Sequence, residues 1–132
     1  MKIFTFIILL GIVFEIGLPF MAIAQQSNDS SGNLFIPNKI RNKGKIKAGT
    51  RIKERFVLHN NSSKTIYIEY VNPDCNCTSY QVSSYQILPS DSIFIDLELD
   101  TQYKYGEEKV YTIIKTKDKE MYKLTIKANV YD

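Results

Sequence analysis

The only cysteines of the chain, Cys75 and Cys77, are separated by a single residue, and their thiols are the groups best suited to chemistry. A disulfide between them would close a very small loop and remove little entropy from the unfolded chain. As thiolates they suit Cu(I) or half of a zinc shell, although the sequence offers no second cysteine pair and no histidine-rich tract. A third alternative is a pair that only shapes its loop and packs sulfur against the domain. Disulfide or structural use is favoured, and a copper or thiol-redox site is the alternative.

Residues with the spacing of a catalytic site are otherwise missing from the sequence. His59 is the only histidine, and nothing supplies the orienting group that a thiol protease needs. There is no Gly-x-Ser-x-Gly elbow and no glycine-rich phosphate loop. The alternate carboxylates within residues 96–100 lie on one face of a strand, which indicates a solvated face rather than a glycosidase pair. We therefore expect a protein that is not an enzyme and needs no cofactor.

A run of basic residues extends over two expected elements of the chain. Its members are Lys39, Arg41, Lys43, Lys45, Lys47, Arg51, Lys53 and Arg55. The run could attract anionic lipid headgroups, polysaccharide or an acidic partner. We favour a simpler interpretation, in which residues 51–55 pair across neighbouring strands with the carboxylates of residues 96–100. Only residues 39–47 would then stay unpaired as a basic surface.

Nine tyrosines and no tryptophan are many aromatic rings of one kind for this length. Exposed tyrosines suit contacts with proteins or glycans, and the alternative is that they form the rim of a small domain. The candidate binding residues are Tyr67 and Tyr70 together with the cysteine segment, Cys75, Asn76, Cys77 and Thr78.

The elements that would position these groups are β-strands, because apolar residues alternate with polar ones and turn residues recur every 8 to 12 positions. The clearest strand is 93–99, whose four aliphatic side chains share one face. Glu54 interrupts the apolar face of its strand, and we expect its carboxylate to reach water at the rim. The seven expected strands are 34–40, 52–58, 66–71, 80–88, 93–99, 110–116 and 122–131.

The N-terminus has the features of a cleavable secretory signal. An apolar stretch follows Lys2 and is interrupted by Glu15, which is too short for the about 20 residues that a membrane span needs. Small residues at 22–24 predict cleavage before Gln25, so residues 1–24 are the signal peptide and residues 25–33 a flexible polar lead-in. The domain would comprise residues 34–132. We expect an exported soluble protein, in a periplasm or outside the cell.

Two further features restrict the cellular role. No cysteine lies near the cleavage point, so the chain is not expected to be a lipoprotein, and no stable membrane span remains after cleavage. The formal net charge of +3 is too small to indicate a nucleic-acid partner.

Four segments read in order resemble a known bacterial family. They are Gly44–Gly49 (GKIKAG), Phe56–Asn60 (FVLHN), Pro73–Thr78 (PDCNCT) and Leu88–Ser90 (LPS). Together they resemble the exported family called "domain of unknown function 1573", with Asn76 and Ser90 where the family has glycine. The resemblance implies an immunoglobulin-like sandwich related to PapD-like domains, which bind partners by adding a strand at a sheet edge.

The sequence thus predicts an all-β, seven-stranded, antiparallel immunoglobulin-like sandwich after a signal peptide. Its expected function is a non-enzymatic protein-binding or scaffold module of the cell envelope, whose partner is another envelope or secreted protein. The alternative function is Cu(I) binding or thiol redox chemistry at the cysteine pair. The oligomeric state cannot be read from the sequence.

Overall fold

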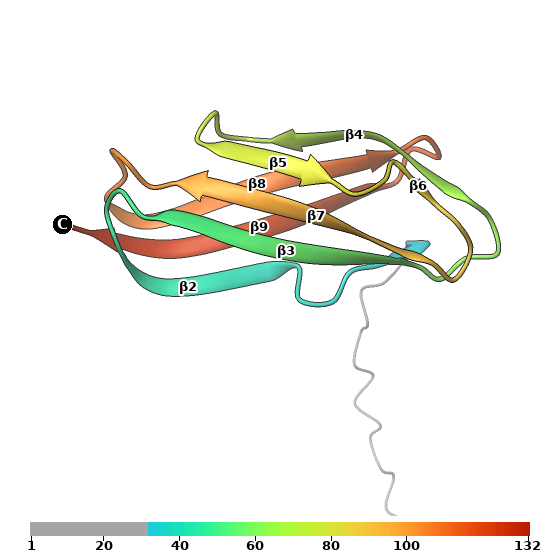
Figure 1. Ribbon diagram of the computed structural model, residues 1–132, viewed down its shortest axis with the longest axis horizontal. Helices are drawn as coiled ribbons and strands as arrows, with labels where there is room; N and C mark the ends of the chain where they lie inside the picture. Colours follow the sequence, from blue (N-terminus) through green and yellow to red (C-terminus); the bar gives the residue numbers. More distant parts are fainter. Residues whose placement is uncertain (1–31) are drawn as a thin grey trace, which may run out of the picture.

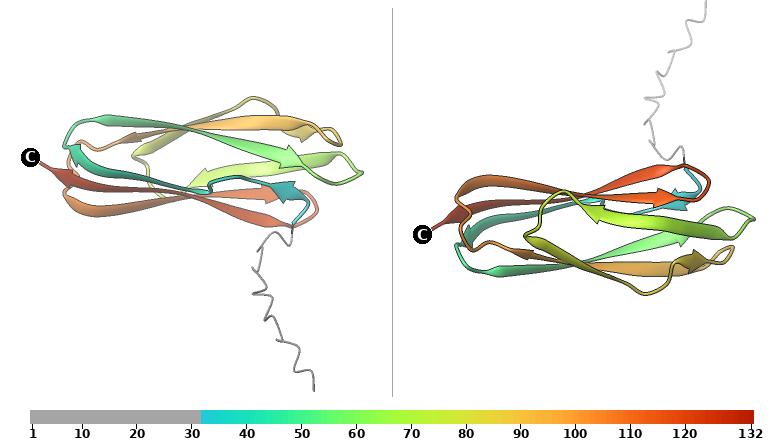
Figure 2. Two further views of the ribbon diagram at one scale, coloured as in Figure 1. Left: turned by 90° about the horizontal axis from the view of Figure 1, so that it is seen from below. Right: turned by 90° about the horizontal axis from the view of Figure 1, so that it is seen from above.

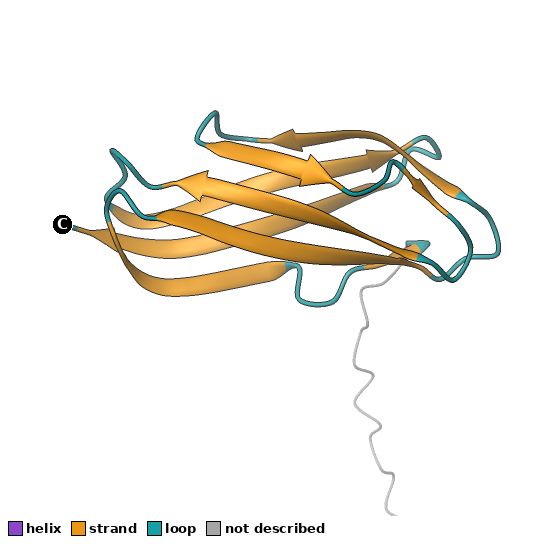
Figure 3. Ribbon diagram, in the orientation of Figure 1, coloured by secondary structure: helices purple, strands orange, loops and turns teal. Residues whose placement is uncertain are grey.

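The computed structural model describes residues 32–132, and the predicted signal peptide and nearly all of the lead-in lie outside them. Within this range the chain forms nine strands and no helix (Figures 1 and 3). The strands are β1 (Leu34–Phe35), β2 (Ile40–Lys47), β3 (Arg51–Asn60), β4 (Ile66–Pro73), β5 (Thr78–Val82), β6 (Gln86–Ile87), β7 (Ser92–Asp100), β8 (Gly106–Thr116) and β9 (Met121–Tyr131).

The strands build two sheets that face each other as a sandwich (Figure 2). The four-stranded sheet has the order β1-β3-β7-β5, and the five-stranded sheet has the order β2-β9-β8-β4-β6. The predicted all-β immunoglobulin-like sandwich is therefore confirmed.

The predicted number of seven strands is wrong, because two expected strands each divide between the sheets. The opening segment 34–40 breaks at Pro37 and Asn38, where Asn38 has a φ of 54°. Proline has no N–H to donate to a ladder, and the left-handed asparagine turns the chain from β1 in one sheet to β2 in the other. Segment 80–88 likewise divides into β5 and β6 around residues 83–85.

The prediction of a wholly antiparallel sandwich is also wrong, since β2 runs parallel to β9. The pairing extends from Ile40 opposite Thr125 to Lys47 opposite Tyr131, with a bulge between Asn42 and Lys45. Gly44 lies in this bulge at a φ of 65°, a backbone conformation that costs glycine little.

Strand alternation places the core between the sheets. The inward aliphatic residues of β7 are buried, as expected from 93–99, and Phe56, Leu58 and Leu124 are fully buried. The predicted cross-strand ion pairs are present on the outer face of the four-stranded sheet. The opposed residues are Arg51 with Asp100, Lys53 with Glu98, and Arg55 with Asp96.

The expectation that the Glu54 carboxylate reaches water at the rim is wrong. The Glu54 side chain is only 13% exposed, because Arg41 and Lys43 of β2 cover the carboxylate, with Arg41 Nε 3.3 Å away. Arg41 also lies over the Phe56 ring and donates to the carbonyl oxygen of Arg55 at 3.1 Å. Arg41 and Lys43 therefore each have an ion-pair partner, whereas residues 39–47 were expected to be unpaired. We call this cluster the Glu54 clasp, and it closes the side of the sandwich where β2 meets β3.

Candidate binding edge

The exposed edge of the four-stranded sheet is β5, which pairs with β7 on one side only. The bonds that flank this pairing join the carbonyl oxygen of Cys77 to the N–H of Asp100 and the N–H of Ser83 to the carbonyl oxygen of Phe94. Hydrogen-bonded pairs alternate in an antiparallel ladder, so residues 79 and 81 also turn their backbone groups toward β7. The N–H and C=O groups of Tyr80 and Val82 consequently face the open edge.

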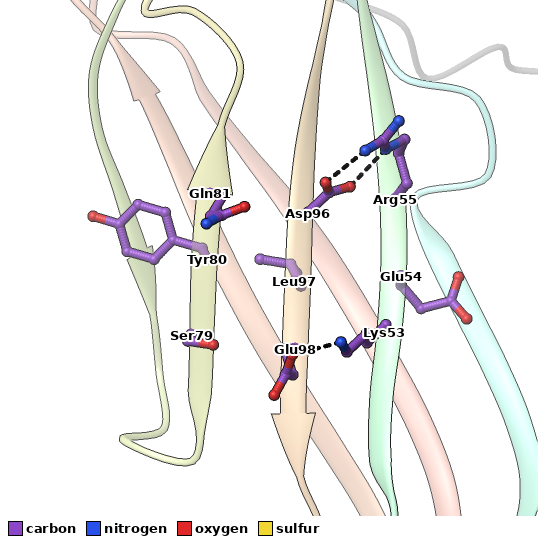
Figure 4. A pocket seen from close by; sticks show the side chains of 9 residues that line it. All are labelled: Lys53, Glu54, Arg55, Ser79, Tyr80, Gln81, Asp96, Leu97 and Glu98. Atoms are coloured by element: carbon purple, nitrogen blue, oxygen red, sulfur yellow. Dashed lines mark hydrogen bonds and ion pairs between the residues drawn. The ribbon is translucent and has the colours of Figure 1, made fainter.

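The composition of β5 leaves this edge open to another strand. Its five residues, Thr-Ser-Tyr-Gln-Val, include no charge and no proline, and their register with β7 has no bulge. Lysines, prolines and bulges are the features with which proteins usually block an edge. The Tyr80 side chain is 40% exposed, and Figure 4 shows its ring directed away from β7. Partial burial raises the pKa of Tyr85, and the neighbouring Tyr80 raises it further.

The cysteine loop fixes the start of this edge. Cys75 and Cys77 form a disulfide and are partly buried against the core. The N–H of Thr78 donates to the carbonyl oxygen of Cys75 at 3.0 Å, and Thr78 itself is buried while Asn76 is exposed. The four predicted residues 75–78 therefore lie together, directly before the outward-facing groups of β5.

The first half of the loop is fixed from the other sheet. The N–H of Asp74 donates to the carbonyl oxygen of Tyr111 at 2.9 Å, and the N–H of Tyr111 donates back to Asp74 Oδ1 at 3.0 Å.

Among residues 32–132 no group of three or more His, Cys, Asp or Glu side chains is arranged to hold a metal ion.

A shallow concavity of about 620 Å³ lies beside β5 on the outer face of the four-stranded sheet (Figure 4). It is lined by Lys53, Glu54, Arg55, Ser79, Tyr80, Gln81, Asp96, Leu97 and Glu98. Arg55 donates two hydrogen bonds of 2.7 Å to Asp96, and these lower the pKa of Asp96 and raise that of Arg55. The charges of the concavity are thus matched by neighbouring side chains, with Glu54 held by β2 of the other sheet, and the β5 wall is neutral and polar.

The remaining predicted residues lie elsewhere. Tyr67 and Tyr70 belong to β4 of the five-stranded sheet, where Lys117 and Lys115 lie over their rings. The basic surface lies along β2, at the edge of the five-stranded sheet opposite β6. Its residues are Lys39, Arg41, Lys43, Lys45 and Lys47. The structure therefore does not join either set to the cysteine loop.

Two features were missed by the sequence analysis. The first is the edge formed by Tyr80 and Val82, for which the uncharged run 78–82 between two charged strands was an available signal. The second is a contact of 2.5 Å between His59 Nδ1 and Ser92 Oγ at the start of β7. His59 also stacks on Phe35, and within the described part of the chain nothing orients its other ring nitrogen. This contact lacks the third member that a nucleophilic triad requires.

None of the residues described here forms a helix with the length and apolar character to cross a membrane.

Solved structures with the same fold come from bacteria and from humans. A protein of unknown function from Porphyromonas gingivalis W83 superposes with a TM-score of 0.65 at 14% identity, over 74% of this chain and 46% of that one. The VesB protease of Vibrio cholerae gives a TM-score of 0.58 at 13% identity, over 74% of this chain and 32% of the protease. PapD-like domain 7 of human CEP192 gives 0.57 at 8% identity, over 76% of this chain and 86% of that domain.

At these identities the similarity concerns the fold alone, and the chain spans less than half of the first two proteins. No curated protein matches the sequence. A family model does match, over residues 35–130, which is most of the chain. The chain belongs to the family described as proteins of unknown function, DUF1573.

Proposed function

We propose that this protein is a non-enzymatic binding module that takes an extended segment of another protein along the open edge of β5. The observation that carries the proposal is the pair of outward-facing backbone sites at Tyr80 and Val82 on a strand without charge, proline or bulge. A segment laid along this edge gains main-chain hydrogen bonds, and its alternate side chains can contact the exposed tyrosines.

The other three edge strands are less suited to this role. β1 and β6 contain two residues each, which is too short to template a partner strand. β2 is long, but it carries five charged residues counted with the adjoining Lys39 and has a bulge at Gly44. β5 is therefore the edge at which strand addition meets the least obstruction.

The setting that we propose is the cell envelope. The predicted signal peptide, residues 1–24, would export the chain to a periplasm or the cell exterior, where envelope and secreted proteins are the available partners. Such a module requires no cofactor.

The proposal is tested by selecting peptides from a random displayed library against the purified chain and measuring their affinity for variants of Tyr80. Tyr80→Pro removes the outward N–H without removing a bond to β7, because proline is tolerated where an edge N–H faces solvent. Tyr80→Thr is the matched control, since it removes the same ring but keeps the N–H.

We expect Tyr80→Pro to weaken the selected peptides at least tenfold, and Tyr80→Thr to weaken them less. The proposal fails if no peptide is selected, or if the two variants bind the peptides equally well. Circular dichroism of both variants checks that the sandwich is retained.

A further inference from the structure

The outer face of the five-stranded sheet carries a line of lysines on its two longest strands. They are Lys109 and Lys115 of β8, Lys117 directly after β8, and Lys123 and Lys127 of β9. The residues that alternate with them, such as Val110, Ile114 and Leu124, are buried in the core, so these lysines point outward. We call the five residues the lysine strip.

The charges of the strip are largely unmatched. Lys109 and Lys127 lie directly opposite each other in the β8–β9 register, and like charges in this position destabilise a sheet. Within residues 32–132 only Lys115 of the strip has an ion-pair partner, Glu69 at 3.0 Å. On the outer face of the four-stranded sheet, by contrast, each basic residue of β3 lies opposite an acidic residue of β7. The strip therefore retains a local excess of positive charge.

Tyrosine rings support several of these ammonium groups. The distances from Nζ to the ring centre are 5.6 Å for Lys115 over Tyr70, 5.3 Å for Lys117 over Tyr67 and 4.8 Å for Lys123 over Tyr111. Such contacts hold a flexible side chain near one position. Less side-chain entropy is then lost when a ligand binds.

The shape of the strip suits a linear polyanion. Lys109 and Lys115 are about 20 Å apart along β8, and the two strands are only about 5 Å apart. Measured along the strands, successive lysines of the strip lie about 7 to 13 Å apart, whereas a nucleic-acid strand carries a charge about every 3.4 Å. An acidic polysaccharide, with one carboxylate on each sugar ring or on every second ring, has the sparser spacing that matches the lysines.

We infer that the lysine strip binds an acidic polysaccharide, with the ammonium groups contacting carboxylates and the tyrosines lying beside the sugar rings. A membrane is a poorer match, because binding at a lipid surface relies on a continuous apolar face that enters the headgroup region, and here charged side chains lie between the exposed apolar ones. The strip is separate from β5, so this inference does not depend on the proposed function.

The test measures binding of the purified full-length chain to polygalacturonate at low ionic strength, with neutral dextran as the blank. The variant Lys109→Gln/Lys127→Gln removes the opposed pair. The matched control, Lys53→Gln/Lys64→Gln, removes the same number of positive charges from β3 of the other sheet and from the turn that follows β3.

We expect the Lys109/Lys127 variant to lose at least tenfold in affinity and the control variant less than threefold, with the binding of the unchanged chain falling steeply as salt is added. Equal losses in the two variants, or no binding of polygalacturonate, would overturn the inference. Tighter binding of phosphatidylglycerol vesicles or of single-stranded DNA than of polygalacturonate would overturn it as well. Tyr80→Pro should leave polygalacturonate binding unchanged, which separates this result from the test of β5.

Discussion

The two long sides of the sandwich differ in how their edges are treated. Where β2 meets β3, the Glu54 clasp joins the two sheets. The Arg41 guanidinium there donates a hydrogen bond to the backbone carbonyl oxygen of Arg55, which a partner strand would otherwise use as an acceptor. Where β5 ends the four-stranded sheet, the strand is neutral and its outward backbone groups have no such cover. The same fold thus blocks strand addition on one side and permits it on the other.

The largest expected effect comes from breaking the clasp. Glu54→Ala leaves two cations beside a partly buried site without their carboxylate, and we expect a loss of about 2 kcal/mol in the free energy of unfolding. Urea denaturation measures it. Glu107→Ala is the control, because Glu107 is exposed and should change stability by less than about 0.5 kcal/mol. Equal losses in the two variants would mean that the clasp does not stabilise the closed side.

The disulfide before β5 should contribute less. Because the loop between Cys75 and Cys77 is so short, the double variant Cys75→Ser/Cys77→Ser should lose at most about 1.6 kcal/mol and stay folded. Thermal unfolding followed by circular dichroism provides the measurement. Titration of the untreated chain with a thiol reagent should find no reactive thiol, and two reactive thiols would favour the copper or thiol-redox alternative instead.

The ion pairs between β3 and β7 should make the stability of the protein depend on pH. The pKa of Asp96 is below its ordinary value of 3.8, chiefly because Arg55 donates hydrogen bonds to it. A carboxylate with a lowered folded pKa stabilises the protein at neutral pH, and this contribution is lost as the pH falls through that pKa. The effect is small because the pair is exposed.

Asp96→Asn should therefore be less stable than the unchanged chain at pH 7, and the difference should be smaller at about pH 3. Urea denaturation at the two pH values makes the comparison. A difference in stability that is the same at both would show that the charge of Asp96 has no part in it.

The smallest expected effect on stability is that of Tyr80→Pro. Because no bond to β7 is removed at this position, we expect a change of less than about 0.5 kcal/mol relative to Tyr80→Thr, which lacks the same ring. Ser79→Pro, one residue earlier, removes a ladder bond and should cost clearly more. If thermal unfolding ranks the two variants in the opposite order, the assignment of outward and inward backbone groups on β5 is wrong.

Strand periodicity was enough to predict the sandwich and its core, since the four aliphatic side chains of 93–99 and the charge pattern of residues 51–55 and 96–100 fix face and register together. Periodicity does not report which sheet a strand joins. The crossings at Asn38 and at residues 83–85 depend on local turn conformation, and they changed seven expected strands into nine.

The candidate site was predictable only in part. Residues 75–78 lie together because they are consecutive, but Tyr67 and Tyr70 are placed by β4 on another sheet. Glu54 was expected at the rim because it interrupts an apolar face. The expectation failed because its cationic partners come from β2, a segment that was expected to be unpaired. Whether a strand lies at an open edge depends on the order of the strands in the assembled sheet, and the residue pattern of one strand does not predict that order.

The central claim, that β5 accepts a partner strand, is tested most directly by amide hydrogen exchange at single residues, with and without a peptide selected against the chain. In the free protein the amides of Tyr80 and Val82 should exchange quickly and those of residues 79 and 81 slowly. Bound peptide should slow exchange at Tyr80 and Val82 and leave residues 79 and 81 nearly as they were. The account is contradicted if the peptide protects amides of β2 or of another face while Tyr80 and Val82 continue to exchange quickly.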